Sequence, residues 1–296
     1  LPREYPRTLR SKGIRCAVFN PFRPSLSSTH NHRDHRKILV IDGRIAFTGG
    51  INLADEYINK LERFGHWKDN AIMIKGEAVE SFTRMFLRLW NFAAADRFSM
   101  PQPPAGESQP APAEDGFALP YEDNPLDEEA VGMNVYLNMI LKAKRYLYIT
   151  TPYLIIDDGL SGALCLAAKS GVDVRIITPG VPDKWYVHAV TRANYRPLIK
   201  AGVKIFEYSP GFIHSKSFLS DDKVGTVGTI NLDFRSFFLH FECGVWLYGC
   251  DSLVSLKNDF LTTQGLCREI TMQELETEKL QRKVSGWLLR VFSPLL

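Results

Sequence analysis

The sequence lacks three features that would place it in a simple class of protein. It has no uninterrupted run of about 18 apolar residues, the length that a membrane-spanning helix needs. Its five cysteines show no CxxC spacing, which argues against both a disulfide framework and a cysteine-ligated zinc site. Its net charge is only +3 over 296 residues, so bulk electrostatics does not favour nucleic acid as a partner. A chain of this length can bury a large core as one or two domains.

What the sequence does contain is one short pattern written twice. His-x-Lys-x4-Asp-x6-Gly occurs in two copies whose histidines are 179 residues apart, and an asparagine follows each copy. One match among such ordinary residues could be chance, but two matches at one spacing indicate a duplicated site. A duplicated histidine–lysine pair favours chemistry on an anion. The residues are His35, Lys37, Asp42, Gly49 and Asn52 in the first copy, and His214, Lys216, Asp221, Gly228 and Asn231 in the second.

The first copy predicts a β-hairpin, because apolar and β-branched residues flank an Asp42-Gly43 pair. With a two-residue turn, Lys37 lies opposite Thr48 and His35 lies opposite Gly50. Residues i and i+2 of a strand share a face, so the histidine and the lysine should point the same way. The aspartate falls at the far end of the hairpin, which indicates a structural role for this member of the motif.

Small residues follow in both copies. Gly49 and Gly50 should leave the space above the imidazole open, so that a phosphate can approach without meeting a Cβ atom. In the second copy Gly228 and Thr229 take these places, and Asp221-Asp222 stands at the turn.

The repeat extends beyond the motifs. Residues 9–21 mirror residues 198–210, and Asp69 and Glu242 each stand at the start of a strand that could lie beside the histidine of their own half. An acid that accepts a hydrogen bond from the second ring nitrogen fixes the tautomer of a histidine and stabilises its imidazolium form. We therefore predict one orienting acid in each half.

The pattern of elements predicts an α/β fold. Residues 134–197 alternate helices with strands, as a parallel or mixed sheet requires. Residues 77–95 predict an amphipathic helix with an aromatic core stripe at Val79, Phe82, Phe86 and Trp90. The Pro-rich residues 99–129 predict a linker. We expect a first lobe at residues 1–98, a linker at 99–129, a second lobe at 130–270, and a C-terminal amphipathic helix or tail at 271–296.

The first half has almost no counterpart for residues 134–197, and the sequence begins with Leu. These features predict an N-terminally truncated first lobe that lacks two strands of its sheet. We also expect the 296 residues alone to be poorly stable and largely inactive.

Other signals have ordinary alternatives. His30, His32 and His35 cluster, but no carboxylate pair or cysteine completes a metal site, so no metal is expected. His66 could line a cleft or lie in a loop. Asp233 and Arg235 favour a structural ion pair over a ligand role for Arg235 or Ser236. The C-terminal stretch, with Trp287, Leu288, Val291 and Phe292 among basic residues, could lie in a membrane interface or dock on the protein, and we favour the membrane slightly.

The doubled motif resembles that of the phospholipase D superfamily, and within it the chain resembles the bacterial cardiolipin synthases over nearly its whole length. The segments that carry the resemblance are residues 35–42, 49–57, 63–69, 123–127, 151–153, 177–180, 210–216, 228–237 and 292–296.

The resemblance implies two similar phospholipase D-like lobes, each a mixed sheet flanked by helices, with the active site where the lobes meet. It implies metal-independent phosphatidyl transfer without a cofactor, which joins two phosphatidylglycerol molecules into cardiolipin plus glycerol through a phosphohistidine. By analogy His35 is the nucleophile and His214 the acid and base, although the near-symmetry of the sequence leaves this open. Both motif lysines and both motif asparagines, Asn52 and Asn231, would hold the phosphoryl oxygens. The implied location is the bacterial cytoplasmic membrane, with an anchor in the missing N-terminal part.

Two other functions use the same residues. A hydrolytic phospholipase D or a nuclease of the superfamily would use water as the acceptor, although the near-neutral charge disfavours the nuclease. A catalytically inactive membrane scaffold is the third alternative, and the two intact motifs argue against it.

Overall fold

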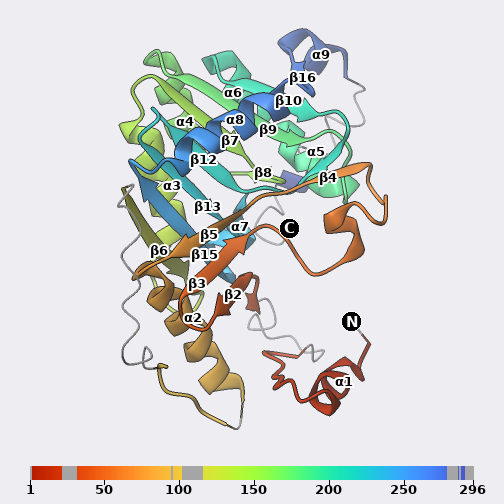
Figure 1. The fold of residues 1–296 in the computed structure, drawn as a ribbon. Coiled ribbons are helices and arrows are strands. Elements are labelled where there is room, and N and C mark those ends of the chain that lie inside the picture. The colour runs from red at the N-terminus through yellow and green to blue at the C-terminus, as the bar shows by residue number, and fades with distance from the viewer. Residues whose placement is uncertain are drawn as a thin grey trace.

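A computed structural model describes residues 2–21, 32–94, 96–101, 116–278, 286 and 288–290. In the first half, the motif hairpin is followed by a short crossing strand, a third strand and one long helix (Figure 1). The elements are α1 (Tyr5–Ser11), β1 (Arg33–Asp34), β2 (Ile38–Ile41), β3 (Ile45–Gly49), the 3₁₀ helix η2 (Asp55–Ile58), β4 (His66–Lys68), β5 (Ala71–Lys75) and α2 (Ala78–Ala93).

The second half alternates strands and helices as its sequence predicts. Its elements are β6 (Phe117–Asp123), α3 (Val131–Lys142), β7 (Tyr146–Thr150), β8 (Leu154–Ile155), α4 (Asp158–Lys169), β9 (Asp173–Pro179), α5 (Trp185–Ala193), α6 (Tyr195–Ala201), β10 (Lys204–Tyr208), β11 (Gly211–Ile213), β12 (Ser217–Ser220), β13 (Val224–Gly228), β14 (Leu232–Asp233), α7 (Phe234–Phe238), β15 (His240–Tyr248), α8 (Ser252–Gln264), β16 (Cys267–Ile270) and α9 (Met272–Thr277).

One large mixed sheet organises the molecule. Its strands run in the order β1-β15-β13-β12-β7-β9-β10-β16, and β6 also pairs with β15. The strands β7, β9 and β10 are parallel, whereas β12, β13 and β15 are joined antiparallel. Helices α3, α4 and α6 cover one face, where Tyr136, Leu164 and Leu198 lie in the core. The predicted fold class, mixed sheets flanked by helices, is confirmed.

The first half contributes a separate three-stranded sheet, β2-β3-β5. Its inner face does not close a core of its own. Ala46, Ile74 and Phe82 of the first half belong to the same buried cluster as Val245 and Phe260 of the second half. The two halves therefore share one hydrophobic core, and this shared core fixes how their motifs meet.

The outer face of this small sheet has no helical cover among the described residues. Leu39 is 56% exposed, whereas Phe218, the equivalent residue in the second half, is 1% exposed because it stacks on Tyr136 of α3 at 4.1 Å. Residues 15–19, which mirror β10 in sequence, form no strand. Among the described residues, the first half therefore has no equivalent of the α3 cover over Phe218 and no equivalent of strand β10.

Two predicted elements differ from the structure. Strand β6 lies inside the stretch predicted to be linker, where it pairs with β15 from Phe117 to Asp123. On helix α2 the buried stripe ends early: Val79 and Phe82 are fully buried, but Phe86 is 46% exposed and stacks on Trp90. The second half of the predicted stripe, Phe86 and Trp90, therefore lies outside the buried core.

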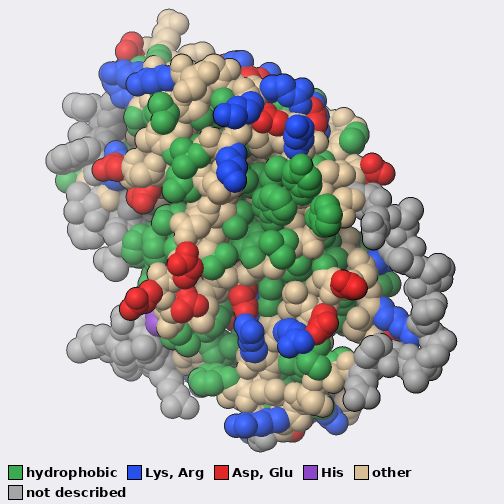
Figure 2. Space-filling view, turned by 90° about the vertical axis from the view of Figure 1, so that its left-hand side faces the viewer, with side chains coloured by type: hydrophobic (Ala, Val, Ile, Leu, Met, Phe, Trp, Pro, Cys, Tyr) green, Lys and Arg blue, Asp and Glu red, His purple; other side chains and the backbone are tan. Residues whose placement is uncertain are grey.

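The side of the molecule that carries β6 and α3 has a band of hydrophobic side chains across its middle (Figure 2). Phe117 and Leu119 of β6 are exposed, and Tyr248 lies opposite Phe117 in register. Within the described ranges no second strand pairs with β6, so this edge of the large sheet is open.

The C-terminal prediction falls largely outside the described residues, which include only Gly286 and residues 288–290 of that stretch. Leu289 packs against the cluster of Ile155, Val187 and Val190, and Arg290 forms an ion pair with Asp158. These residues dock on the protein. Among the helices of the described residues, none has the length and hydropathy to cross a bilayer.

Candidate active site

Both motif hairpins have a three-residue connection. Ile41 pairs with Ile45 and Ser220 pairs with Val224, so the predicted two-residue turn is wrong in both copies. The cause is the left-handed backbone of the first two loop residues, with φ of 52° and 67° at Asp42 and Gly43. The register moves by one residue, and Ile38 rather than Lys37 lies opposite Thr48.

The two histidines lie just before β2 and β12, and each is held by an acid from the other half. His35 Nδ1 lies 2.8 Å from Glu242 Oε1, and His214 Nδ1 lies 2.8 Å from Asp69 Oδ2. The sequence identified both acids, but the pairing within each half was wrong. Because β4 pairs with β11 and β1 pairs with β15, each half carries its acid to the histidine of the other half.

The residues beside the motifs are small because the acids and their neighbours lie very close to them. A Cβ atom on Gly50 would lie 2.1 Å from Asp69 Oδ1, and one on Gly49 would lie 2.3 Å from the backbone oxygen of Asn70. We expected Gly49 and Gly50 to leave an open space for phosphate. In the structure they instead allow the segment that carries Asp69 to approach closely. In the second copy Thr229 stands in place of Gly50 and donates its hydroxyl hydrogen to Glu242 Oε2. Gly228 meets the Cys243 carbonyl in the way that Gly49 meets Asn70.

Lys216 is buried beside His214, and Lys37 is partly buried beside His35. Lys216 is 1% exposed and donates to the backbone oxygen of His214, and Lys37 Nζ donates to the backbone oxygen of His35 at 2.5 Å. Burial lowers the pKa of Lys216 to about 7, although the charges of Asp69 and Glu242 raise it. Burial also lowers the pKa of Lys37. The site therefore holds cationic groups that lack full solvation, a state that a bound anion would relieve.

The electrostatics keeps both imidazoles neutral near pH 7. Burial lowers the pKa of His214 to about 3, and Lys216 acts in the same direction against Asp69. Burial lowers the pKa of His35 as well, against the raising effect of Glu242. Each histidine also feels the lysine of the other half, which places both motifs in one electrostatic site.

The acids remain ionised. Burial raises the pKa of Asp69, but the hydrogen bond with His214 and the charge of Lys216 outweigh it and the pKa lies below its usual range. Burial likewise raises the pKa of Glu242, and its interactions with His35, His240 and Lys37 hold it well below that range.

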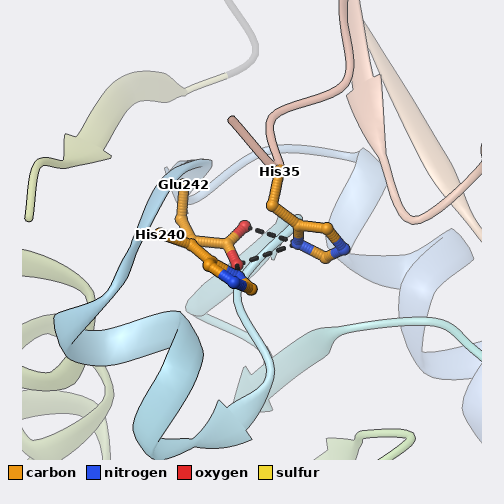
Figure 3. A group of neighbouring side chains, drawn as sticks. All are labelled: His35, His240 and Glu242. Atoms are coloured by element: carbon orange, nitrogen blue, oxygen red, sulfur yellow. Dashed lines mark hydrogen bonds and ion pairs between the residues drawn. The ribbon is translucent and has the colours of Figure 1, made fainter. Parts of the chain in front are cut away.

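Figure 3 shows the His35 dyad, in which both carboxylate oxygens of Glu242 face one ring nitrogen and the other nitrogen points away from them. Within the part of the chain that the structure describes, Nε2 of neither motif histidine makes a hydrogen bond. A neutral imidazole whose Nδ1–H is held by a carboxylate presents its Nε2 lone pair outward, which suits a nucleophile or a base.

The two motif asparagines differ in exposure, because Asn52 is partly buried and Asn231 is buried. Asn52 Nδ2 donates to Tyr57 Oη at 2.5 Å, whereas the side-chain oxygen of Asn231 is buried without a hydrogen-bond partner among the described residues. Aromatic rings surround His214: Tyr57, Trp67 and Phe212 have ring centroids 5.4, 5.3 and 5.9 Å away. This wall limits the access of water to one side of the site.

The motif aspartates lie at the far ends of the hairpins, away from the dyads. Asp221 accepts backbone hydrogen bonds from Lys144, Arg145 and Tyr146, which ties the β12–β13 loop to the start of β7. Asp42 occupies the corresponding loop of the first half with a left-handed backbone.

The remaining candidates have structural contacts. His66 Nδ1 lies 2.9 Å from the Tyr208 hydroxyl. Asp233 accepts the backbone N–H of Ser236 and so caps α7, and Ser236 Oγ accepts the backbone N–H of Asn231. His30 lies outside the described residues, and His32 is partly buried before β1.

A three-residue group brings together atoms that could in principle face a cation. Ligand-type atoms of His35, His240 and Glu242 lie within 4.8 Å of one another. The carboxylate oxygens of Glu242 already accept from His35 and Thr229, and the charge of Lys37 acts on the same site. This donor set fits an anion-binding dyad better than a metal site.

His240 and the three rings around His214 were not predicted from the sequence as parts of the site. The available signal was the alternation of a strand, because Trp67 and His240 stand two residues before the acids Asp69 and Glu242 and must share their faces.

Known proteins are similar to this chain in sequence. A family model described as "Cardiolipin synthase, PLD-like domain" matches residues 136–263. The chain is 39% identical over 297 residues to a cardiolipin synthase of Geobacillus sp. (strain WCH70), covering 100% of this chain and 59% of that protein. It is 47% identical over 293 residues to an uncharacterized protein of Streptococcus mutans serotype c, covering 99% of this chain and 63% of that protein.

One solved structure matches over most of the chain. The crystal structure of phosphatidylserine synthase from Haemophilus influenzae Rd KW20 has a TM-score of 0.63 at 18% identity, covering 88% of this chain and 69% of that one. This likeness concerns the fold alone. The chain spans 59–63% of the length of the sequence relatives named above. By its similarity over the whole of its own length and by its doubled motif, the chain belongs to the bacterial cardiolipin synthase family of the phospholipase D superfamily.

Proposed function

We propose that the protein containing this chain joins two phosphatidylglycerol molecules into cardiolipin and glycerol through a covalent phosphohistidine. The observation that carries the proposal is the pair of histidine–carboxylate dyads with Nδ1–oxygen distances of 2.8 Å. A double displacement at phosphorus needs one neutral imidazole whose Nε2 lone pair attacks and a second imidazole that carries the proton for the leaving group, and each dyad turns its Nε2 atom away from its carboxylate.

In the first step Nε2 of one histidine attacks the phosphorus of a phosphatidylglycerol. A P–N bond forms, the P–O bond to the terminal glycerol breaks, and the other histidine gives its proton to the departing oxygen. In the second step that histidine removes the proton from a terminal hydroxyl of a second phosphatidylglycerol. The new P–O bond forms as the P–N bond breaks, so atoms and protons balance over the cycle.

The acid histidine needs a proton that the empty site disfavours. An anionic phosphodiester between Lys37 and Lys216 offsets the positive charges that lower the pKa of His35 and of His214. Substrate binding therefore raises both pKa values toward neutrality, and the proton enters the site together with the anion. Both lysines then lie where the phosphoryl charge develops, which supplies electrostatic stabilisation of the transition state.

The role assignment follows the family resemblance, with His35 as nucleophile and His214 as acid and base. Asn52 and Asn231 would hold the non-bridging oxygens through their side-chain amide N–H groups, which are hydrogen-bond donors. We propose the membrane surface as the place of reaction, since the substrates are lipids.

The test uses the complete gene product with vesicles of phosphatidylglycerol. The proposal expects cardiolipin and glycerol in equal amounts, and loss of both in the variants His35→Ala and His214→Ala. Phosphatidic acid as the main product would make the enzyme a hydrolase. Alkaline quenching and mass spectrometry of the modified peptide locate the phosphohistidine, and a modification on His214 alone would reverse the role assignment.

A further inference from the structure

The two dyads differ at one position that the doubled motif does not include. Trp67 stands two residues before Asp69, and His240 stands two residues before Glu242. Each packs on the histidine that its acid holds: the ring centroids of Trp67 and His214 are 5.3 Å apart, and those of His240 and His35 are 5.5 Å apart. Equivalent places in the two halves therefore hold an indole and an imidazole.

His240 is placed to act on the carboxylate that holds His35. Its Nδ1 lies 3.7 Å from Glu242 Oε1, the same oxygen that His35 Nδ1 contacts at 2.8 Å. That Nδ1 atom is buried and has no hydrogen-bond partner among the described residues. Figure 3 shows both rings on the side of Glu242 where its carboxylate lies.

We propose that His240 is a positioning residue that controls how much of the Glu242 charge is available to His35, and thereby makes the two catalytic histidines chemically unequal. The catalytic consequence of this inference rests on the proposed function. The contact between His240 and Glu242 is independent of it. The ionisable groups around His240 are Glu242 on its own strand, His35 before β2 and Asp233 at the start of α7, with Lys37 and Lys216 beyond His35.

The sign of the effect follows from competition for one carboxylate. Burial raises the pKa of Glu242, and its interactions with His35 and His240 lower it, so both rings interact with the same carboxylate. Removing the His240 ring leaves the full negative charge to His35 and must raise the proton affinity of His35. In the other dyad Trp67 has no titratable group, and within the described residues its indole nitrogen makes no hydrogen bond.

The chain offers a matched control. His188 Nε2 lies 3.6 Å from Glu207 Oε1 and, like His240 Nδ1, is buried without a hydrogen-bond partner among the described residues. The side chain of His188 is 19% exposed and that of His240 is 14% exposed. His188 belongs to α5 and packs against neither motif histidine, so a change there tests the loss of a partly buried histidine alone.

The experiment compares His240→Leu, His240→Gln and His188→Leu in the complete gene product. One readout is the ring titration of His35 by NMR without substrate. The other is the dependence of kcat and KM on pH with phosphatidylglycerol vesicles. We expect His240→Leu to raise the pKa of His35 by about one unit and to move the pH limit of kcat that depends on His35 by the same amount, with KM changed less than about twofold.

The variant His240→Gln keeps an N–H donor and should give a smaller shift in the same direction, and it remains informative if His240→Leu does not fold. An unchanged His35 titration in His240→Gln and His240→Leu would overturn the inference, as would an equal shift in His188→Leu. The NMR readout needs no turnover. A shifted titration in an enzyme that makes no cardiolipin would contradict the proposed function and leave the role of His240 standing.

Discussion

Replacing Lys216 by methionine should stabilise the fold while it abolishes turnover. Lys216 is 1% exposed, and its ammonium group has no carboxylate within ion-pair distance among the described residues; its hydrogen bond is to the carbonyl of His214. A fall in the pKa of this group from 10.5 to about 7 corresponds to roughly 5 kcal/mol of penalty on its charged form.

The net gain is smaller than this penalty. Methionine leaves the His214 carbonyl without its donor, which costs about 1 kcal/mol, and relaxation with water entry reduces the penalty of a buried charge. We therefore expect Lys216→Met to raise the free energy of unfolding at pH 7 by about 1–3 kcal/mol.

The pH dependence separates this explanation from a simple packing effect. Between pH 7 and 10.5 the unfolded chain binds a proton at Lys216 that the folded chain does not, so the stability of the natural protein should rise with pH in that window. The variant should lose this rise. Urea unfolding at pH 7, 8 and 9 measures both quantities, and Lys257→Met, which removes an ion pair with Asp222 at the surface, should be neutral or slightly destabilising. A variant less stable than the natural protein at pH 7, or one with an unchanged pH slope, would refute the reasoning.

Three further predictions concern residues of the two motif hairpins and the segments that follow them. Gly50→Ala should lower kcat about 100-fold, because the new Cβ would lie 2.1 Å from Asp69 Oδ1 and must displace the acid from His214; steady-state kinetics measures it. Thr229→Val should lower kcat about tenfold by removing the hydroxyl that donates to Glu242, and Thr229→Ser should restore it. Asp221→Ala should cost about 2–3 kcal/mol of stability in urea unfolding, because three backbone N–H groups lose their acceptor, while kcat per folded molecule changes less than about twofold.

Each of these three predictions has a control or an outcome that would contradict it. Gly162→Ala on α4 meets no atom within 4 Å and should leave kcat unchanged, so an equal loss there would contradict the argument for Gly50. If Thr229→Ser were as slow as Thr229→Val, the hydroxyl would not be the important group. A large loss of kcat in folded Asp221→Ala would move that aspartate from a structural to a catalytic role.

The sequence predicted the parts of the site that local patterns encode. The duplicated motif identified both histidine–lysine pairs, and the alignment of the halves identified Asp69 and Glu242 as their acids. The first hairpin was predictable because a β-branched run precedes Asp-Gly, and the second because it repeats the first motif. Their register was not, since the third loop residue depends on left-handed φ angles at Asp42 and Asp221 that several turn types share.

The remaining differences have tertiary causes. Strand β6 follows a Pro-rich stretch and contains Pro120 itself, and it becomes a strand because β15 offers an edge to pair with. The exchange of the acids depends on how the two halves pack, through β4 with β11 and β1 with β15, and no spacing within one half carries that information. His240 stood outside the repeat pattern because its counterpart is Trp67.

The exchanged acids have a consequence for the origin of the enzyme. A single copy of the motif holds a histidine and an acid that do not reach each other, so one unduplicated unit cannot assemble a complete dyad. Two identical units that face each other across a two-fold axis form two complete dyads. In such an interface the histidine of each unit meets the acid of the other. The present chain therefore has the internal symmetry of a fused homodimer, in which His240 and Trp67 mark where the two copies have since diverged.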